Sequence, residues 1–335
     1  MQYRRMGTTS LQVSELALGT WLNFGPKLHG AEASRYVQLA LDAGINLIDT
    51  AESYEGGDVE SMVGEILRES GRRRDTYCLC TKLFYGAVKR KDRAKLQPTQ
   101  HGLSRKHLVD GCNQSLQRLG LDYIDILLCH RHDPAASYEE LAWTMHMLVL
   151  QGKILYWGTS EWEPEQIQEV TSFCHDNGLI GPSVEQPQYN LLHKDRINKL
   201  LNHQTLTSQL GLITWSPLAS GLLTGRYDEN PDRSGRLNDA ETRWVRSMVF
   251  GDNPTAAMRS AREVSSVAKE LGVSAPQLAI AWCLKNPAVS SVILGGSSVE
   301  QLSENLHAVN LQDRLDPAIM RRLNEAGSPV DDEKD

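Results

Sequence analysis

The chain lacks several features that mark large classes of protein. It contains no run of about eighteen or more apolar residues, so we expect no membrane-spanning helix and no membrane insertion. Its first six residues hold no apolar segment of the kind found in secretory signals, and we therefore expect a cytoplasmic protein. The net charge is −7, which gives no general attraction to nucleic acid or to anionic lipid.

Two common cofactor and metal motifs are also missing. No Gly-x-Gly-x-x-Gly follows a predicted strand, so a Rossmann dinucleotide site is not indicated. Cys78 and Cys80 resemble a metal-binding pair, but no second Cys or His pair occurs at zinc-like spacing. We therefore predict that the six cysteines are reduced residues, most of them in the hydrophobic core, and that the protein holds no metal.

What the chain does contain is an alternation of strand-like and helix-like stretches along its whole length. The predicted strands cover residues 16–21, 46–50, 77–82, 123–130, 154–159, 183–188, 212–216 and 290–295. The predicted helices cover residues 31–43, 59–69, 105–119, 138–151, 163–177, 194–209, 256–271 and 299–309. No linker rich in Gly, Pro or Ser interrupts the pattern, so we predict one domain over residues 1–335. Its class is α/β, and its fold is a (β/α)8 TIM barrel preceded by a β-hairpin at residues 3–14.

Two connections are longer than the short strand-to-helix loops of such a barrel. One runs from Tyr85 to Ser104 and is rich in Lys and Arg, and the other runs from Leu218 to about Thr255. Both follow strands, so both should lie at the carboxyl ends of the strands, where barrel active sites are built. Ordinary solvated charge is the simpler interpretation of the first loop, whereas the second is predicted to be functional.

Four residues that can transfer or position a proton stand at the ends of successive predicted strands: Asp49, Tyr54, Lys82 and His130. A free tyrosine, with a pKa of about 10, is a poor acid–base group at neutral pH, but a lysine ammonium beside it favours the phenolate. A carboxylate can pair with the buried lysine, and a neutral histidine can donate a hydrogen bond to a substrate oxygen. We predict Tyr54 as general acid, tuned by Lys82, with Asp49 pairing Lys82 and His130 orienting a carbonyl.

These four residues, together with the runs at 19–21, 102–107, 157–160 and 215–222, give the chain a family likeness. It resembles the aldo-keto reductases, and within them the branch of the voltage-gated potassium channel β-subunits and their bacterial reductase relatives. The resemblance implies that the hairpin plugs the barrel bottom and that the four residues form the catalytic tetrad. It also implies NADPH-dependent reduction of aldehydes or activated ketones to alcohols.

A phosphate site is indicated where Gly295, Gly296 and Ser297 follow the last predicted strand and precede a helix. Free N–H groups and the positive helix end would favour an anion there, although a glycine pair and a capping serine are also good loop chemistry. The resemblance implies that the cofactor is NADP(H). The residues that it places on the cofactor are Thr20, Trp21, Asp49, Ser160, Gln186, Trp215, Ser216, Pro217, Leu218, Arg226, Arg236, Gly295, Ser297, Gln301, Glu304 and Asn305.

The predicted substrate pocket is walled by aromatic residues at or just beyond the strand ends. Its predicted members are Trp21, Tyr54, Tyr85, His130 and Trp162. Such walls suit aldehydes with an aryl or alkyl body, although ordinary rim packing would also explain the two tryptophans. If the loop at residues 89–95 leans over the entrance, an anionic or phosphorylated aldehyde becomes a further hypothesis. His132 competes with His130 but lies beyond the strand end, so we interpret it as a rim or surface residue.

Some positions depart from the family pattern. Glu161 stands where Asn or Arg is usual beside the carboxamide-binding serine, so the sequence leaves open whether it contacts the cofactor. Pro187 is unusual after Gln186, and the basic loop after Tyr85 is longer than the branch usually carries. These departures bear on the cofactor contact of Glu161 and on the substrate entrance, and less on the catalytic residues.

Two other functions remain open on the sequence alone. The nearest branch includes regulatory subunits, so the chain could instead sense NADP(H) with incidental slow turnover. The sequence argues against a third function, a barrel enzyme that catalyses a non-redox reaction such as metal-dependent hydrolysis, because it lacks clustered metal ligands. The partners that we expect are a small-molecule carbonyl substrate and, by resemblance, further copies of the chain in a homo-oligomer such as a tetramer.

Overall fold

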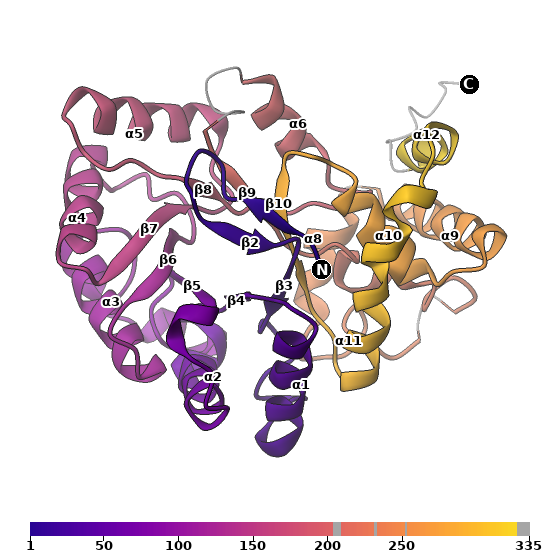
Figure 1. Ribbon diagram of the computed structural model, residues 1–335, viewed down its shortest axis with the longest axis horizontal. Helices are drawn as coiled ribbons and strands as arrows, with labels where there is room; N and C mark the ends of the chain where they lie inside the picture. The colour runs from indigo at the N-terminus through magenta and orange to yellow at the C-terminus, as the bar shows by residue number, and fades with distance from the viewer. Residues whose placement is uncertain (204–208, 231–232, 252, 327–335) are drawn as a thin grey trace.

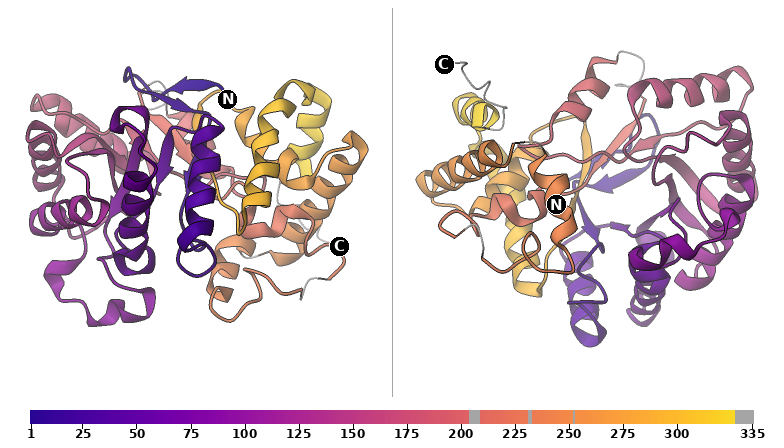
Figure 2. Two further views of the ribbon diagram at one scale, coloured as in Figure 1. Left: turned by 60° about the horizontal axis from the view of Figure 1, so that its bottom comes forward. Right: turned by 180° about the vertical axis from the view of Figure 1, so that it is seen from behind.

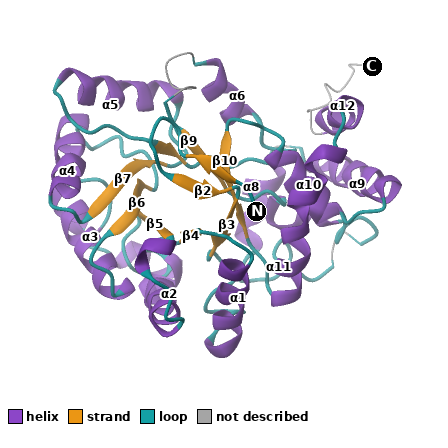
Figure 3. Ribbon diagram, viewed as in Figure 1, coloured by secondary structure: helices purple, strands orange, loops and turns teal. Residues whose placement is uncertain are grey.

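Eight parallel strands close into a barrel in the computed structural model, which describes residues 1–203, 209–230, 233–251 and 253–326. The strands follow one another around the barrel in chain order, with the last one closing against the first, and helices surround them (Figures 1 and 3). They are β3 (Leu16–Gly19), β4 (Leu47–Asp49), β5 (Cys78–Leu83), β6 (Ile124–Cys129), β7 (Ile154–Thr159), β8 (Val184–Glu185), β9 (Gly211–Thr214) and β10 (Val289–Leu294). Before the barrel, β1 (Tyr3–Arg5) pairs antiparallel with β2 (Gln12–Ser14). The predicted (β/α)8 barrel and its N-terminal hairpin are confirmed.

Eight helices lie close to their predicted positions, and three further helices in the described part of the chain, at residues 246–250, 275–284 and 317–326, were not predicted. They are α1 (Gly30–Asp42), α2 (Asp58–Glu69), α3 (Arg105–Leu119), α4 (Tyr138–Leu150), α5 (Pro164–Asp176), α6 (Asp195–Asn202), α8 (Arg246–Phe250), α9 (Pro254–Leu271), α10 (Ala275–Leu284), α11 (Val299–Leu306) and α12 (Pro317–Ala326). Of the helix predicted over residues 194–209, positions 204–208 lie outside the described residues. The helix predicted over 299–309 is wrong at its end, because α11 gives way at His307 to a 3-10 helix that runs to Arg314. None of the described helices is both long enough and apolar enough to cross a membrane.

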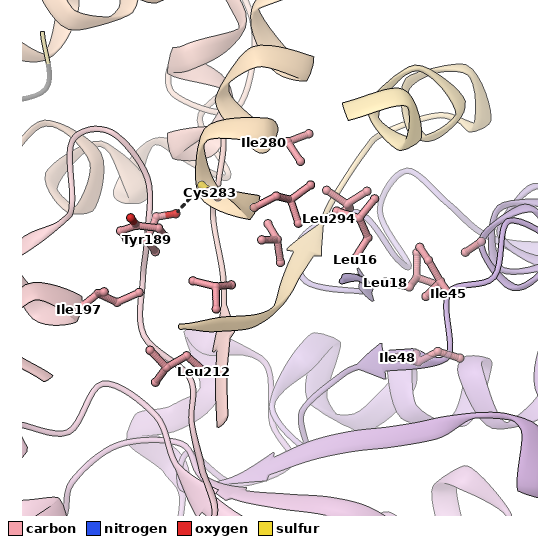
Figure 4. Packing of buried hydrophobic residues seen from close by; sticks show 14 of the residues in the cluster. Leu16, Leu18, Ile45, Ile48, Tyr189, Ile197, Leu212, Ile280, Cys283 and Leu294 are labelled. Atoms are coloured by element: carbon pink, nitrogen blue, oxygen red, sulfur yellow. Dashed lines mark hydrogen bonds between the residues drawn. The ribbon is translucent and has the colours of Figure 1, made fainter. Parts of the chain in front are cut away.

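Hydrophobic side chains form two layers. Leu16, Leu18 and Leu212 lie in the larger cluster, which joins the outer face of the strands to helix residues such as Ile197 and Ile280 (Figure 4). The smaller cluster fills the barrel, and it includes Met6, Val13, Ala17, Leu47, Cys80, Ile126, Leu128, Val184, Ile213 and Ile293. Because side chains alternate between the two faces of a strand, neighbours such as Ala17 and Leu18 belong to different layers. All six cysteines are buried and free.

The hairpin and the long connections lie at opposite ends of the barrel. Met6 and Val13 at the hairpin are fully buried inside the barrel end. In the left view of Figure 2, the indigo hairpin is at one end, and the long purple and orange connections extend from the other. The carboxyl ends of the strands are therefore free to form a site, as the barrel architecture predicts.

Close packing between β7 and β8 depends on one glycine. A Cβ atom at Gly158 would lie 2.0 Å from the carbonyl oxygen of Val184, which is closer than any real contact. Gly158 pairs with Val184 in the parallel ladder, so a larger residue would push the two strands apart. Because residue 158 is glycine, β7 packs closely against β8, and Ser160 and Gln186 follow these two strands.

Glu185 in β8 is a carboxyl group that is fully buried in the strand layer. Its Oε2 accepts a hydrogen bond from the Thr159 hydroxyl, and its Oε1 has no hydrogen-bond partner within the described part of the chain. Burial raises the pKa of this carboxyl from 4.5 to about 8. The folded protein therefore keeps a proton on Glu185 at neutral pH, whereas the unfolded chain releases it.

We expect Glu185→Gln to stabilise the protein at pH 8 by about 4 kcal/mol and to have little effect near pH 4. Between the unfolded pKa of 4.5 and the folded pKa of about 8, the folded state binds more protons. Wild-type stability should therefore fall as pH rises through this window, and glutamine removes that loss. Urea unfolding at both pH values measures the difference, with the exposed Glu165→Gln as control. An equal effect at both pH values would contradict the assignment of a protonated Glu185.

Candidate active site

Lys82, Asp49 and Tyr54 meet at the carboxyl end of β4 and β5. Asp49 is the last residue of β4, Lys82 lies near the end of β5, and Tyr54 begins a short 3-10 helix (Tyr54–Gly57) after β4. The Lys82 Nζ donates to Asp49 Oδ2 at 2.7 Å, to the Thr50 carbonyl at 2.8 Å and to the Tyr54 hydroxyl at 3.1 Å. The predicted ammonium–phenol and ammonium–carboxylate contacts are therefore present in the geometry.

The electrostatics of this group keep the proton on Tyr54. Burial raises the pKa of Tyr54 above its ordinary value, and the Lys82 ammonium opposes this shift without cancelling it. Burial alone would lower the pKa of Lys82, but Asp49 and Tyr54 raise it above its ordinary value. The sequence led us to expect that Lys82 would bring the pKa of Tyr54 closer to the neutral range. The pKa is raised instead, because burial of the phenol raises it more than the Lys82 ammonium lowers it. A phenol with a raised pKa is a proton donor at neutral pH.

His130 follows β6 and faces the same space. Its ring centroid lies 6.2 Å from that of Tyr54 and 5.1 Å from that of Tyr85. Burial lowers the pKa of His130 well below its ordinary value, and the cations Arg131, Lys82 and Arg93 add to the effect. The imidazole is therefore neutral at physiological pH and can donate one hydrogen bond. Its Nδ1 is buried without a hydrogen-bond partner among the described residues.

A cavity of about 1500 Å³ connects these residues to the N-terminal end of α11. The predicted site residues that line it are Trp21, Asp49, Tyr54, Tyr85, His130, Ser160, Gln186, Trp215, Ser216, Pro217, Leu218, Arg226, Arg236, Gly295, Ser297, Gln301, Glu304 and Asn305. The volume exceeds the roughly 300–1,000 Å³ of common small-molecule sites, so it has room for a dinucleotide together with a small substrate.

Three predicted site residues lie outside the lining of this cavity. Lys82 is buried behind Asp49 and Tyr54, where it contacts both. Thr20 is fully buried and donates its hydroxyl hydrogen to the carbonyl of Asp49. Trp162 is 1% exposed and packs edge-on against His132 at 4.9 Å between ring centroids. The structure therefore places Trp162 in packing beneath the surface and not on the predicted pocket wall.

The ends of β7 and β8 form a polar wall beside Asp49. The Ser160 hydroxyl donates to the carbonyl of Gln186 at 3.0 Å, and the Gln186 amide donates to Asp49 Oδ1 at 2.7 Å. Each carboxylate oxygen of Asp49 therefore accepts one of these hydrogen bonds, Oδ2 from Lys82 and Oδ1 from Gln186. Gln186, a predicted cofactor-binding residue, is thus joined directly to the proton-transfer group, and Ser160 is joined to it through Gln186.

Glu161, the unusual residue after Ser160, is occupied by contacts within the protein. Its Oε1 accepts from the Trp215 indole N–H at 2.9 Å and from the Gln188 backbone N–H at 2.5 Å. Its Oε2 forms an ion pair with Arg196 at 3.2 Å. Its backbone has a φ of +62°, a conformation that is uncommon for residues other than glycine. Glu161 therefore fixes the edge of the Trp215 ring, which lines the cavity.

The opposite end of the cavity is built from β10, α11 and the long connection after β9. The Ser298 hydroxyl, and not that of Ser297, caps α11 by accepting from the Gln301 N–H. Ser297 instead donates to the Gln301 side chain at 3.1 Å. Arg236 donates to Asn23 at 2.8 Å, and within the described residues it forms no ion pair with a carboxylate. A half-buried guanidinium of this kind, which lines the same cavity as Ser297 before the N-terminus of α11, fits an anionic group such as a phosphate.

Several residues that line the cavity did not stand out in the sequence, including Asn23, Arg131 and Trp244. Arg131 directly follows His130, so its place after a strand end was a usable signal. Trp244 lies in a long connection whose sequence has no helical or strand periodicity, so no sequence pattern marked it. Its position over the cavity is known only from its contact with Arg90. The Arg90 guanidinium lies 3.9 Å from the Trp244 ring centroid, so the two long connections meet over the cavity.

Comparisons with known proteins agree with this geometry. A family model described as the aldo/keto reductase family matches residues 15–327. A probable voltage-gated potassium channel subunit beta from Oryza sativa subsp. japonica is 40% identical over 326 residues, covering 96% of this chain and 95% of that protein. A putative voltage-gated potassium channel subunit beta from Schizosaccharomyces pombe is 39% identical over 324 residues, covering 96% and 92%. A probable subunit beta from Arabidopsis thaliana is 38% identical over 328 residues, covering 97% and 96%.

Proposed function

Because the chain belongs to the aldo/keto reductase family, we propose that it is an NADPH-dependent reductase that converts aldehydes or activated ketones to alcohols. The observation that carries this proposal is the contact of Lys82 with both Tyr54 and Asp49 at the edge of a cavity that extends to α11. This arrangement places a protonated phenol beside a space large enough for a cofactor and a carbonyl compound.

The chain's own residues account for the steps that a reductase must perform around the carbonyl. The nicotinamide cofactor, when bound, supplies the hydride. His130, which is neutral, donates a hydrogen bond to the substrate oxygen and orients it. Tyr54 gives its hydroxyl proton to the oxygen as negative charge develops there. Lys82 stabilises the phenolate that remains, and Asp49 holds Lys82 in place.

We propose NADP rather than NAD because of the positive groups at the far end of the cavity. Arg226 and Arg236 both line this end, together with Ser297 and Gln301. Arginine pairs well with phosphate through parallel N–H donors, and NADP carries one phosphate more than NAD. Ser160 and Gln186 would hold the carboxamide at the reactive end.

The meeting of the two long connections supports slow exchange of this cofactor. Arg90 in the first loop stacks on Trp244 in the second, and Trp244 packs against Trp21 at 5.9 Å between ring centroids. Trp21 in turn packs against Trp215 at 5.8 Å. We propose that this set of stacked side chains must open before a bound dinucleotide can leave.

We extend the proposal to the setting in which the protein works. The reductase would be a single domain over residues 1–335, would act in the cytoplasm and would form a homo-oligomer, with a tetramer favoured by the family branch. The names of the relatives support a second candidate, a regulatory subunit that binds NADP(H) and turns over slowly. Both candidates use the same cofactor site, and they differ in the rate of reduction.

The test is NADPH oxidation by the purified protein with 4-nitrobenzaldehyde and methylglyoxal, with NADPH binding measured separately by fluorescence. We expect saturable turnover with at least one aldehyde, and tighter binding of NADPH than of NADH. Tight NADPH binding without turnover on a wider panel of aldehydes would support the regulatory subunit instead. Failure to bind either cofactor would refute both candidates.

A further inference from the structure

Three arginine side chains lie at the substrate end of the cavity without a matching carboxylate. Arg90 and Arg93 come from the first long loop and Arg131 follows His130, and all three line the cavity together with Tyr54. Across the part of the chain that the structure describes, none of the three forms an ion pair with Asp or Glu. Arg90 stacks on Trp244, and Arg131 donates to the carbonyl of His130, and neither contact neutralises the positive charge of the arginine.

Arg93 is the best placed of these groups to contact a substrate. Its guanidinium carbon lies 3.9 Å from the centroid of the Tyr85 ring, and that ring lies 5.1 Å from His130. Only the width of one aromatic ring therefore separates Arg93 from the residue that orients the carbonyl. The Arg93 Nε is buried and has no hydrogen-bond partner in the described segments. A buried donor without a partner costs free energy unless a ligand satisfies it.

Three acidic side chains near this end, Asp49, Glu52 and Glu55, are already engaged. Asp49 pairs with Lys82 at 2.7 Å, and Glu55 pairs with Lys89 at 3.2 Å. The negative charge of Glu52 acts on Arg93 from a distance, but Glu52 is buried, and its Oε1 accepts hydrogen bonds from the backbone N–H groups of Phe84 and Gly86. The described ion pairs therefore leave Arg90, Arg93 and Arg131 without a carboxylate partner, although the protein as a whole carries a charge of −7.

We propose that the substrate is a carbonyl compound that carries an anionic group, a carboxylate or a phosphate monoester, and that Arg93 binds this group with Arg90 and Arg131 beside it. This inference rests on the proposed reductase function and adds its substrate class. Guanidinium groups favour both anions because paired N–H donors match their oxygens. The cofactor phosphates have their own cations, Arg226 and Arg236, on the connection after β9.

The experiment compares two aldehydes of similar shape, the anion 4-carboxybenzaldehyde and the neutral 4-nitrobenzaldehyde. Arg93→Gln should raise the KM for the anion about tenfold and leave the neutral aldehyde unchanged, because a charge-assisted hydrogen bond is lost. Arg93→Lys, which keeps the charge, should recover part of the loss. The matched control is Lys95→Gln in the same loop, since Lys95 pairs with Asp92 at 2.6 Å and does not line the cavity.

Glycolaldehyde phosphate, compared with glycolaldehyde, distinguishes the two anions. A larger effect of Arg93→Gln on the phosphate than on the carboxylate would identify a phosphate monoester as the preferred group, and the reverse would identify a carboxylate. Equal effects on charged and neutral aldehydes would overturn the proposal. A weaker affinity of Arg93→Gln for NADPH would overturn it too, by assigning Arg93 to the cofactor. Wild-type protein that reduces neither kind of aldehyde would instead refute the reductase function itself.

Discussion

Tyr54→Phe should lower kcat for aldehyde reduction by a factor between about one hundred and ten thousand while leaving NADPH affinity unchanged. Phenylalanine keeps the ring that faces His130 but removes the hydroxyl that Lys82 contacts at 3.1 Å. The substrate oxygen then has no side-chain proton donor at this position. Steady-state NADPH oxidation gives kcat, and a fluorescence titration gives the affinity for the cofactor.

The pH profile separates this role from a structural one. Tyr54 has a raised pKa and His130 a pKa well below its ordinary value, so neither group should change its protonation between about pH 6.5 and pH 9. Wild-type kcat should therefore be nearly flat over this range and fall only above it, as Tyr54 loses its proton. Tyr138→Phe is the control, because Tyr138 contacts His132 and does not line the cavity. Retention of wild-type kcat in Tyr54→Phe would contradict the assigned proton donor.

Much of this site could be predicted because a parallel barrel simplifies the problem. All strands deliver their carboxyl ends to one face, so Asp49, Lys82 and His130 could be expected on one face without knowledge of any contact. The roles of the cofactor-binding residues came with the family likeness and not from spacing. Their placement along one cavity is a property of the fold, since Ser160 after β7 and Ser297 before α11 are far apart in the chain and line the same space.

Other features could not be predicted, for identifiable physical reasons. Trp162 was expected on the pocket wall, but the turn that follows β7 directs it against His132, and a sequence pattern does not specify such a turn. The helix α10 was missed because eight of its ten residues are buried, so it lacks the polar face that produces a helical period. For Arg90 and Arg93 the sequence favoured solvated charge and left anion binding as a hypothesis, because stacking on Trp244 and Tyr85 depends on loops that meet only in the folded chain.

Lys82→Met should destabilise the folded protein by about 3–5 kcal/mol and also abolish most of the turnover. Methionine has a similar length but removes the ammonium from beside the Asp49 carboxylate, which is 3% exposed and keeps the neutral Gln186 amide as a donor. An uncompensated buried carboxylate is costly, and Tyr54 loses the ammonium that stabilises its phenolate. Urea unfolding measures the first effect, and NADPH oxidation measures the second.

The double variant Asp49→Asn/Lys82→Met separates the two effects. It removes both charges of the buried pair, so most of the lost stability should return, because an amide is far less costly to bury than an unpaired carboxylate. Turnover should not return, since the ammonium beside Tyr54 is still missing. The exposed Lys95→Met serves as control for the loss of a lysine. If the double variant regained both stability and turnover, Lys82 would be a partner of Asp49 alone, and its assigned action on the phenol would be wrong.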